Sequence, residues 1–263
     1  MKIGLNQFSS SPDKKDNLKR VSNILEKSEN DLEIFPEYLM GVSESGVTRD
    51  YVHSLAEELD GEFSSSILDA SREMGISVVY TLFLREKGRV YNVAVFAEKG
   101  VVRVVYRKIH LFDAYGYRES EIFASGKNLA VVDFKNFRIG LAVCFDLRFP
   151  ELFRALAYRG VNLFIVPAAW YRGKYKLDQW RHLIAARAHE NTSYLVAVDQ
   201  VGKFFLGHSL VASPLGFIRF ELGEKEEKLS IELEKGELEE AEKLVPVRKL
   251  WKRNLYSKWL ERL

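Results

Sequence analysis

The chain has 263 residues, of which 47% are hydrophobic and 29% charged, a composition typical of a globular protein that can bury a sizeable core. Its 39 basic and 37 acidic residues are well mixed, so we expect neither a nucleic acid nor a membrane surface as partner. One cysteine cannot form an internal disulfide, the N-terminal residues lack the apolar core of a signal peptide, and no apolar run reaches the roughly 20 residues of a membrane span. We therefore predict a soluble, cytoplasmic protein.

Short β-branched runs alternate with helical patterns along the whole sequence. The first half predicts strands at 2–8, 32–35, 76–84, 89–97 and 101–108, and helices at 13–28 and 67–74. The second half predicts strands at 129–134, 137–144, 161–167, 194–199, 208–213 and 217–220, and helices at 151–158 and 176–190. Lys-Gly pairs separate three of the runs and predict turns between adjacent strands.

Strands outnumber helices, and several strands follow one another directly. This order favours an α/β fold in which two sheets pack together and helices cover them. No linker, low-complexity tract or internal repeat interrupts the pattern, so we predict a single domain over residues 1–263. The charge-dense segment 222–244 is predicted to be solvated scaffold, with a strand at 228–233 and a short helix after Gly236.

Cys144 is the first candidate for chemistry, since it ends an apolar run and precedes a predicted helix. A thiol at a helix N-terminus has a lowered pKa, and the next backbone N–H can donate to a developing oxyanion. A lone cysteine is also explained as a small buried hydrophobe. Pro150 stands where the phosphate loop Cys-x5-Arg requires arginine, which disfavours a phosphatase. Five histidines are present, and none forms a recognisable Cys-His motif.

Glu37 and Lys108 also stand at the ends of predicted strands. A carboxylate partly buried beside aromatic residues has a raised pKa and suits a general base. Each residue has a plainer explanation, as a solvated carboxylate at a turn and a surface lysine. Three strand ends that carry a thiol, a carboxylate and an ammonium nevertheless form a candidate site.

Three segments resemble, in order, the catalytic motifs of the nitrilase, or carbon–nitrogen hydrolase, superfamily. They are FPEY (35–38), YRKIHLFD (106–113) and VCFDLRFPEL (143–152), and ARAHEN (186–191) and GHSLVASPLG (207–216) match two further family segments. The similarity runs from the first strand to about residue 235. It implies a four-layer α-β-β-α sandwich that assembles as a homodimer or a larger homo-oligomer.

The resemblance also assigns the chemistry. It implies Glu37 as general base, Lys108 as its partner and Cys144 as nucleophile, with no metal or cofactor. A second family glutamate maps to Glu119, although the preceding loop is shorter than in some relatives. Lys108 and the backbone N–H of Phe145 would then bind the oxyanion.

The substrate implied by the resemblance is a small amide. Phe-Asp follows the cysteine, where true nitrilases tend to have Trp-Glu, and CFDLRFPEL resembles the omega-amidases and deaminated-glutathione amidases, which act on short amides with a distal carboxylate. Arg148 is a candidate ligand for that carboxylate, or it pairs with Glu151 or Asp146. Trp170 and Tyr171 fall where relatives line the pocket, although both also fit core or interface positions.

Other functions remain open. The same site would serve a nitrilase or an amidohydrolase of N-carbamoyl or N-acyl groups, and a catalytically idle interaction protein could keep this fold. The tail 247–263 is basic, with apolar residues interspersed. An amphipathic helix on a membrane surface is one interpretation of this tail. We expect it instead to pack on a partner subunit, because relatives often extend this segment over a neighbour.

Overall fold

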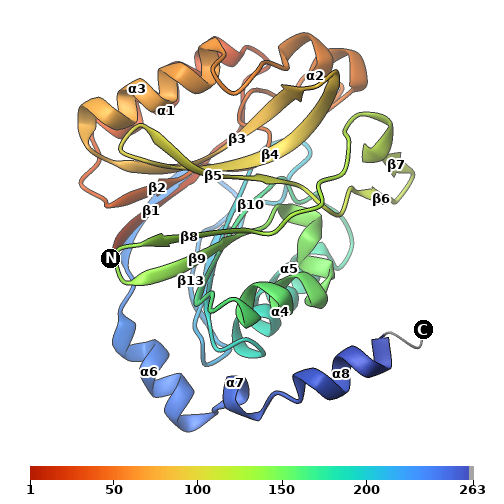
Figure 1. Cartoon of the computed structure of the whole chain (residues 1–263). Coiled ribbons are helices and arrows are strands. Elements are labelled where there is room, and N and C mark those ends of the chain that lie inside the picture. The colour runs from red at the N-terminus through yellow and green to blue at the C-terminus, as the bar shows by residue number, and fades with distance from the viewer. Residues whose placement is uncertain (261–263) are drawn as a thin grey trace.

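Two six-stranded sheets packed face to face form the centre of the molecule (Figure 1). The computed structural model describes residues 1–260. The first sheet has the order β14-β1-β2-β3-β4-β5 and the second β13-β12-β11-β10-β9-β8. The strands of the first sheet are β1 (Lys2–Gln7), β2 (Leu32–Ile34), β3 (Ser77–Glu86), β4 (Arg89–Glu98), β5 (Val101–Arg107) and β14 (Glu227–Glu232). Those of the second are β8 (Ala130–Phe134), β9 (Phe137–Leu141), β10 (Leu163–Ala168), β11 (Tyr194–Asp199), β12 (Leu210–Ala212) and β13 (Ile218–Glu221).

Helices cover the outer face of each sheet, which completes the four layers (Figure 1). The first sheet carries α1 (Lys14–Glu26), α2 (Arg49–Leu55) and α3 (Glu62–Met74), and the second carries α4 (Pro150–Tyr158) and α5 (Lys176–His189). The predicted α-β-β-α sandwich is therefore confirmed.

Smaller elements complete the chain. They are the hairpin β6 (Asp113–Ala114) and β7 (Tyr117–Arg118), the 3-10 helices η1 (Glu119–Glu121) and η2 (Cys144–Arg148), and the C-terminal helices α6 (Lys235–Leu244), α7 (Val247–Leu250) and α8 (Arg253–Leu260).

Side-chain alternation along the strands supplies both faces of a sheet. In β3, Val79 points into the core between the sheets, whereas Val78 and Tyr80 belong to the core under α1 and α3. Successive side chains of a strand point to opposite faces, so one strand serves two layers. This explains why the central strands read as nearly continuous apolar runs.

The Lys-Gly pairs form the turns between adjacent strands, as predicted from the sequence. Lys87-Gly88 and Lys99-Gly100 both have positive φ angles, of 50° and 75° and of 48° and 80°, respectively. Two consecutive positive φ values are the mark of the type I′ turn that joins antiparallel strands, and glycine adopts them without strain.

Most predicted boundaries lie within two residues of the observed ones, and two differ by three residues or more. Helix α3 begins at Glu62 instead of residue 67, although it ends as predicted with Gly75 in the left-handed conformation. Strand β9 ends at Leu141, so Cys144 does not end a strand but opens η2. Helix α2 and the β6–β7 hairpin were not predicted.

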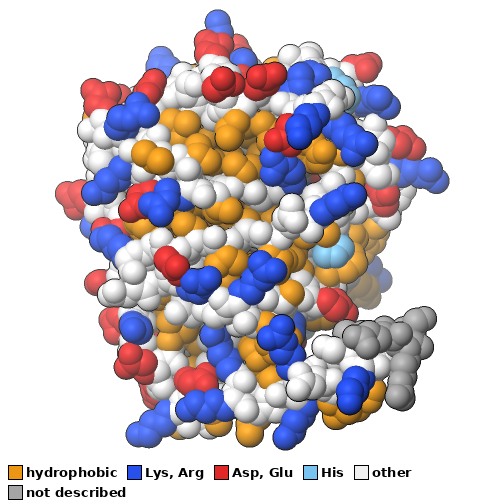
Figure 2. Space-filling view, viewed as in Figure 1, with side chains coloured by type: hydrophobic (Ala, Val, Ile, Leu, Met, Phe, Trp, Pro, Cys, Tyr) orange, Lys and Arg blue, Asp and Glu red, His pale blue; other side chains and the backbone are white. Residues whose placement is uncertain are grey.

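Acidic and basic side chains interleave over the face shown in Figure 2, as the near-balanced composition predicts. No helix within residues 1–260 has both the length and the apolar composition needed to cross a bilayer.

We expect Gly126→Ala to lower the free energy of unfolding by about 1–3 kcal/mol, as overpacking does. A Cβ at this position would lie 2.0 Å from the carbonyl oxygen of Arg107, and the N–H of Gly126 donates to the carbonyl of Lys108 at 2.8 Å. Backbone must therefore move at the end of β5. Urea denaturation measures the change.

Gly223→Ala is the matched control, because no atom lies within 4 Å of its Cβ position. A change within about 0.5 kcal/mol is expected there. Equal stability of the two variants would show that the close approach at Gly126 is not a constraint.

Candidate active site

Glu37, Lys108 and Glu119 form a buried ion-pair cluster. The Nζ of Lys108 lies 2.9 Å from Oε1 of Glu37 and 2.8 Å from Oε2 of Glu119. All three side chains are at most 1% exposed. Glu37 follows β2, Lys108 follows β5 and Glu119 begins η1. The fold thus brings these three sequence-predicted residues together.

Polar neighbours hold both carboxylates in place. The amide of Asn92, in β4, donates to Oε1 of Glu37 at 2.7 Å and to Oε1 of Glu119 at 3.0 Å. The backbone N–H of Ala169 donates to the other oxygen of Glu37 at 2.9 Å, and the hydroxyl of Tyr38 donates to Glu119 at 3.2 Å. Buried carboxylates need such partners, because an unsatisfied one is costly.

Cys144 lines the same cavity as Lys108, from the first residue of η2. Its φ angle is 46°, a left-handed conformation that costs a non-glycine residue roughly 1–3 kcal/mol. The following turn compensates for this strain through Asp146, whose Oδ2 accepts from the N–H of Val143 at 2.9 Å and from the hydroxyl of Tyr106 at 2.8 Å. The nucleophile candidate is thus held in a strained and fixed position.

The remaining predicted residues line the cavity beside Cys144. Glu37 and Glu119 do not line it, but contact the Lys108 ammonium in its wall. Its walls include Phe145, Arg148, Trp170 and Tyr171. Its volume is about 20 Å³, enough for about one water molecule.

Arg148 contacts neither of the acidic residues considered from the sequence. Its Nη2 donates to Oε1 of Gln179 at 2.8 Å, and its guanidinium lies 4.8 Å from the ring centroid of Trp170. No ion pair within residues 1–260 joins it to Glu151 or Asp146, and Asp146 serves the turn instead. The charge of Arg148 therefore remains available on the cavity side.

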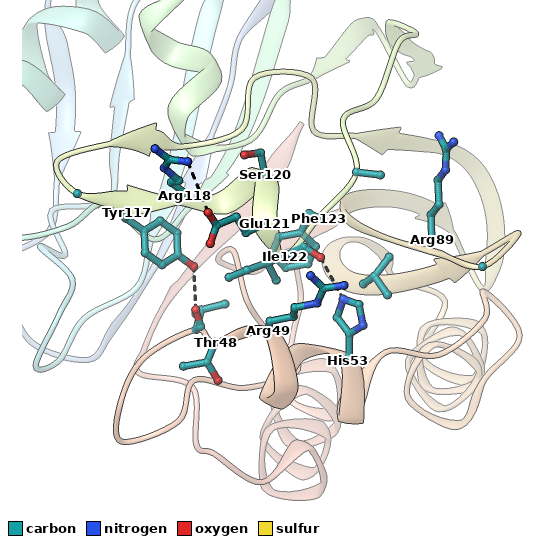
Figure 3. Close-up of a pocket in the computed structure, with 15 residues that line it drawn as sticks. Thr48, Arg49, His53, Arg89, Tyr117, Arg118, Ser120, Glu121, Ile122 and Phe123 are labelled. Carbon is teal, nitrogen blue, oxygen red and sulfur yellow. Dashed lines mark hydrogen bonds and ion pairs between the residues drawn. The ribbon is translucent and has the colours of Figure 1, made fainter.

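A much larger groove lies next to this site but contains different residues (Figure 3). It has a volume of about 940 Å³ and runs between the N-terminus of α2 and the segment that carries η1. Arg118 and Glu121 pair at 3.7 Å on the wall formed by the η1 segment, and Nε2 of His53, in α2, lies 3.1 Å from the carbonyl oxygen of Ile122. Residues on either side of Glu119 face this groove, whereas Glu119 itself faces Lys108. The small cavity, not the large groove, holds the candidate chemistry.

Known proteins are similar to this chain in both sequence and fold. The sequence matches the carbon–nitrogen hydrolase family over residues 2–240. The chain belongs to this family.

Two amidases that are similar in sequence to this chain support the same family. A deaminated glutathione amidase of Escherichia coli O157:H7 is 33% identical over 200 residues, which cover 74% of this chain and 76% of that protein. An omega-amidase of Xenopus laevis is 31% identical over 271 residues, or 97% and 96% of the two chains.

Solved structures show the same architecture. A CN-hydrolase superfamily protein from Xanthomonas campestris, with an arsenic adduct in its active site, superposes with a TM-score of 0.84 at 28% identity and covers 94% of this chain and 95% of its own. An amidase mutant from Nesterenkonia, carrying the acetamide moiety of fluoroacetamide on its active-site cysteine, gives a TM-score of 0.79 at 25% identity, with 98% and 96% covered.

Burial is the largest single influence on the pKa values of the ionisable groups in this carbon–nitrogen hydrolase site. It raises the pKa of Glu37, and the charge of Glu119 adds to that effect while Lys108 opposes it. Burial alone would lower the pKa of Lys108, but the charges of Glu119 and Glu37 outweigh it and raise this pKa well above its ordinary value. Lys108 is therefore a permanent cation near neutral pH.

The predicted lowering of the thiol pKa is wrong. Burial and the charge of Glu37 raise the pKa of Cys144 well above its ordinary value, despite the opposing charge of Lys108. The 3-10 helix that Cys144 opens has only five residues, so its dipole offers little compensation. The hydrolase therefore rests with a neutral thiol near an available base.

Several residues of the hydrolase site were not predicted. Asn92 had one signal in the sequence, since it is a polar residue inside an otherwise apolar strand pattern. Tyr38 follows Glu37 in the FPEY segment, and no signal in the sequence marked its hydroxyl as a partner of Glu119. Lys176 lines the cavity from the start of α5, and no pattern in the sequence distinguished it from a surface lysine.

We expect iodoacetamide to label Cys144 more slowly than a free thiol at about pH 7, because the raised pKa leaves little thiolate. The rate should still be rising above about pH 9, past the ordinary thiol pKa. Mass spectrometry over a pH series measures the rate. Cys144→Ser is the control, since it removes the only cysteine. A plateau already reached near pH 6–7 would contradict the raised pKa.

Proposed function

We propose that this protein hydrolyses the C–N bond of a short linear amide bearing a carboxylate, giving an acid and ammonia through a thioester on Cys144. The observation that carries the proposal is the convergence of Cys144, Lys108 and Glu37, whose charges act on one another in a small buried site. The amidase names of the relatives support the reaction class.

The first half-reaction forms the thioester. Glu37 accepts the thiol proton as the sulfur of Cys144 attacks the amide carbon, and the carbonyl oxygen becomes an oxyanion. The ammonium of Lys108 and the N–H of Phe145 stabilise this charge, and one such donor contributes about 3–4 kcal/mol. Glu37 then passes the proton to the nitrogen, the C–N bond breaks and ammonia leaves.

The second half-reaction releases the acid. Glu37 takes a proton from a water molecule, whose oxygen attacks the thioester carbon. The C–S bond breaks, the acid leaves, and the sulfur regains the proton. The raised pKa of Glu37 suits this alternation between accepting and donating a proton near neutrality.

Glu119 acts as a positioning residue in this proposal. It shares the Lys108 ammonium with Glu37, so that the cation stays fixed while Glu37 changes protonation state.

Cys144→Ala should reduce ammonia release by about 10⁴-fold or more, because the nucleophile is lost. An enzyme-coupled ammonia assay on short amides measures the rate, and thermal unfolding establishes that the variant is folded. Ammonia release at the wild-type rate would remove Cys144 from the mechanism.

A matched pair of variants distinguishes loss of the general base from loss of a nearby carboxylate that has no role in the reaction. Glu37→Gln should also abolish ammonia release, whereas Glu121→Gln, in the outer groove, should leave it unchanged.

The substrate class is tested by a panel of linear amides with and without a distal carboxylate, together with nitriles and N-carbamoyl compounds. We expect ω-amides with a carboxylate to give the highest kcat/KM. The Arg148→Lys variant should raise KM for these amides far more than for neutral amides, since lysine cannot form the bidentate bond to a carboxylate. Equal effects on both kinds of amide would exclude Arg148 as the carboxylate ligand. Faster turnover of nitriles or carbamoyl compounds would favour those alternatives, and no turnover of any compound would favour a non-catalytic interaction protein.

We also propose that the protein forms a homodimer or larger assembly through its C-terminal tail and works in the reducing cytoplasm. Arg248 and Trp251 hold the start of the tail on the body, since Arg248 donates to the carbonyl of Val161 at 2.6 Å and the Trp251 ring packs on Tyr158. Beyond them Trp259 is 54% exposed. Residues 261–263 of the tail lie outside the described residues. Light scattering of the full chain tests this assembly, and a monomeric mass would contradict it.

A further inference from the structure

Lys176, a largely buried lysine, places a second ammonium at the catalytic cavity. Its side chain is the first of α5, lines the cavity beside Cys144 and is only 7% exposed. Lys108 is neutralised by two carboxylates, but no acidic side chain within residues 1–260 forms an ion pair with Lys176. Buried lysines are rare unless they are paired, so this one needs a separate explanation.

Aromatic rings are the neighbours that hold this ammonium. Its Nζ lies 3.7 Å from the ring centroid of Tyr115, 5.6 Å from that of Trp170 and 5.8 Å from that of Phe112. Tyr115 belongs to the exposed turn between β6 and β7 and is itself 69% exposed. A ring face attracts an ammonium less strongly than a carboxylate does, so Nζ can exchange Tyr115 for an anionic ligand.

Arg148 adds a second cation with an unused donor to the same wall. Its Nε is buried and has no hydrogen-bond partner within residues 1–260, although Nη2 is held by Gln179. Its guanidinium also lies over the Trp170 ring, which is one of the rings near Lys176. A buried N–H without a partner costs free energy unless a ligand satisfies it.

The charges across the cavity are therefore unequal. Behind Cys144, the two carboxylates and the Lys108 ammonium leave one net negative charge when all are ionised. On the other wall, Arg148 and Lys176 supply two positive charges and no negative one. An anionic group fits the second wall and is repelled by the first, so charge alone orients a ligand that has a neutral amide at one end and an anion at the other.

We propose that Lys176 is the specificity-determining residue of this hydrolase and that its ammonium, with the Arg148 guanidinium, binds the substrate carboxylate. The proposal rests on the amidase function proposed above. A short chain between amide and carboxylate fits best, because Cys144, Arg148 and Lys176 line the same cavity. The cavity has room for about one water molecule as it stands, so its walls must move apart to admit this substrate.

Lys176 also gives this binding a pH dependence. Burial lowers the pKa of Lys176, the charge of Arg148 lowers it further, and Tyr115 and Cys144 oppose the change. The ammonium is thus lost at a lower pH than in an ordinary lysine. Affinity for a carboxylate should weaken as the pH rises through that pKa, while affinity for a neutral amide should not respond to this group.

The test compares Lys176→Met with wild type on two amides of similar shape, succinamate and butyramide, which differ in carrying a carboxylate or a methyl group. We expect KM for succinamate to rise at least about tenfold while the kinetic constants for butyramide stay within about twofold. Lys176→Arg should recover part of the succinamate KM because it keeps the charge. Lys174→Met is the matched control, since Lys174 is exposed two residues away and should leave both amides unchanged.

A binding measurement separates this proposal from the amidase function. Succinate, in which a second carboxylate replaces the amide of succinamate, should bind wild type at least about tenfold more tightly than Lys176→Met by calorimetry, because the repulsion at its other end is the same in both proteins. Equal losses on succinamate and butyramide, or equal succinate affinities, would overturn the role of Lys176. Absence of amide hydrolysis in wild type with the succinate difference intact would overturn the proposed reaction and leave the carboxylate site standing.

Discussion

The Lys108 ammonium held between Glu37 and Glu119 is the interaction on which the site depends. All three groups are buried, so removing Lys108 would leave two carboxylates uncompensated in a medium that solvates charge poorly. The three residues come from separate parts of the first sheet and its connections. Correct packing of that sheet is therefore a condition for the cluster, and the cluster in turn fixes the loops after β2 and β5.

The second sheet supplies the nucleophile and the backbone that faces the cluster. Cys144 stands at the start of the turn after β9, and the N–H of Ala169, just beyond β10, binds Glu37. Neighbouring parallel strands thus end where the first sheet presents its charges. The face-to-face packing of two sheets is the geometric reason that a thiol and a carboxylate distant in sequence share one cavity.

Periodicity and turn chemistry predicted most of the fold because they depend on neighbours along the chain. The Lys-Gly hairpins and Gly75 are local signals, and they were placed correctly. The hairpin β6–β7 has strands of two residues, too short for any period to appear. The motifs around Glu37, Lys108 and Cys144 indicated the three central site residues, but the thiol pKa depends on burial and on charges contributed by other segments. Lys176 was not predicted for the same reason, since only the folded chain shows that this lysine is largely buried and has no ion-pair partner among residues 1–260.

The neutral state of the Cys144 sulfur has a consequence for the durability of the protein. Peroxides oxidise thiolates much faster than thiols, and each step beyond sulfenic acid is irreversible without a dedicated repair system. The sulfur of Cys144 is deprotonated only during turnover, and the cavity beside it has room for about one water molecule. Both features slow its oxidation by peroxides. Because the chain has no second cysteine to resolve a sulfenic acid as a disulfide, this protection matters more here than in a redox sensor.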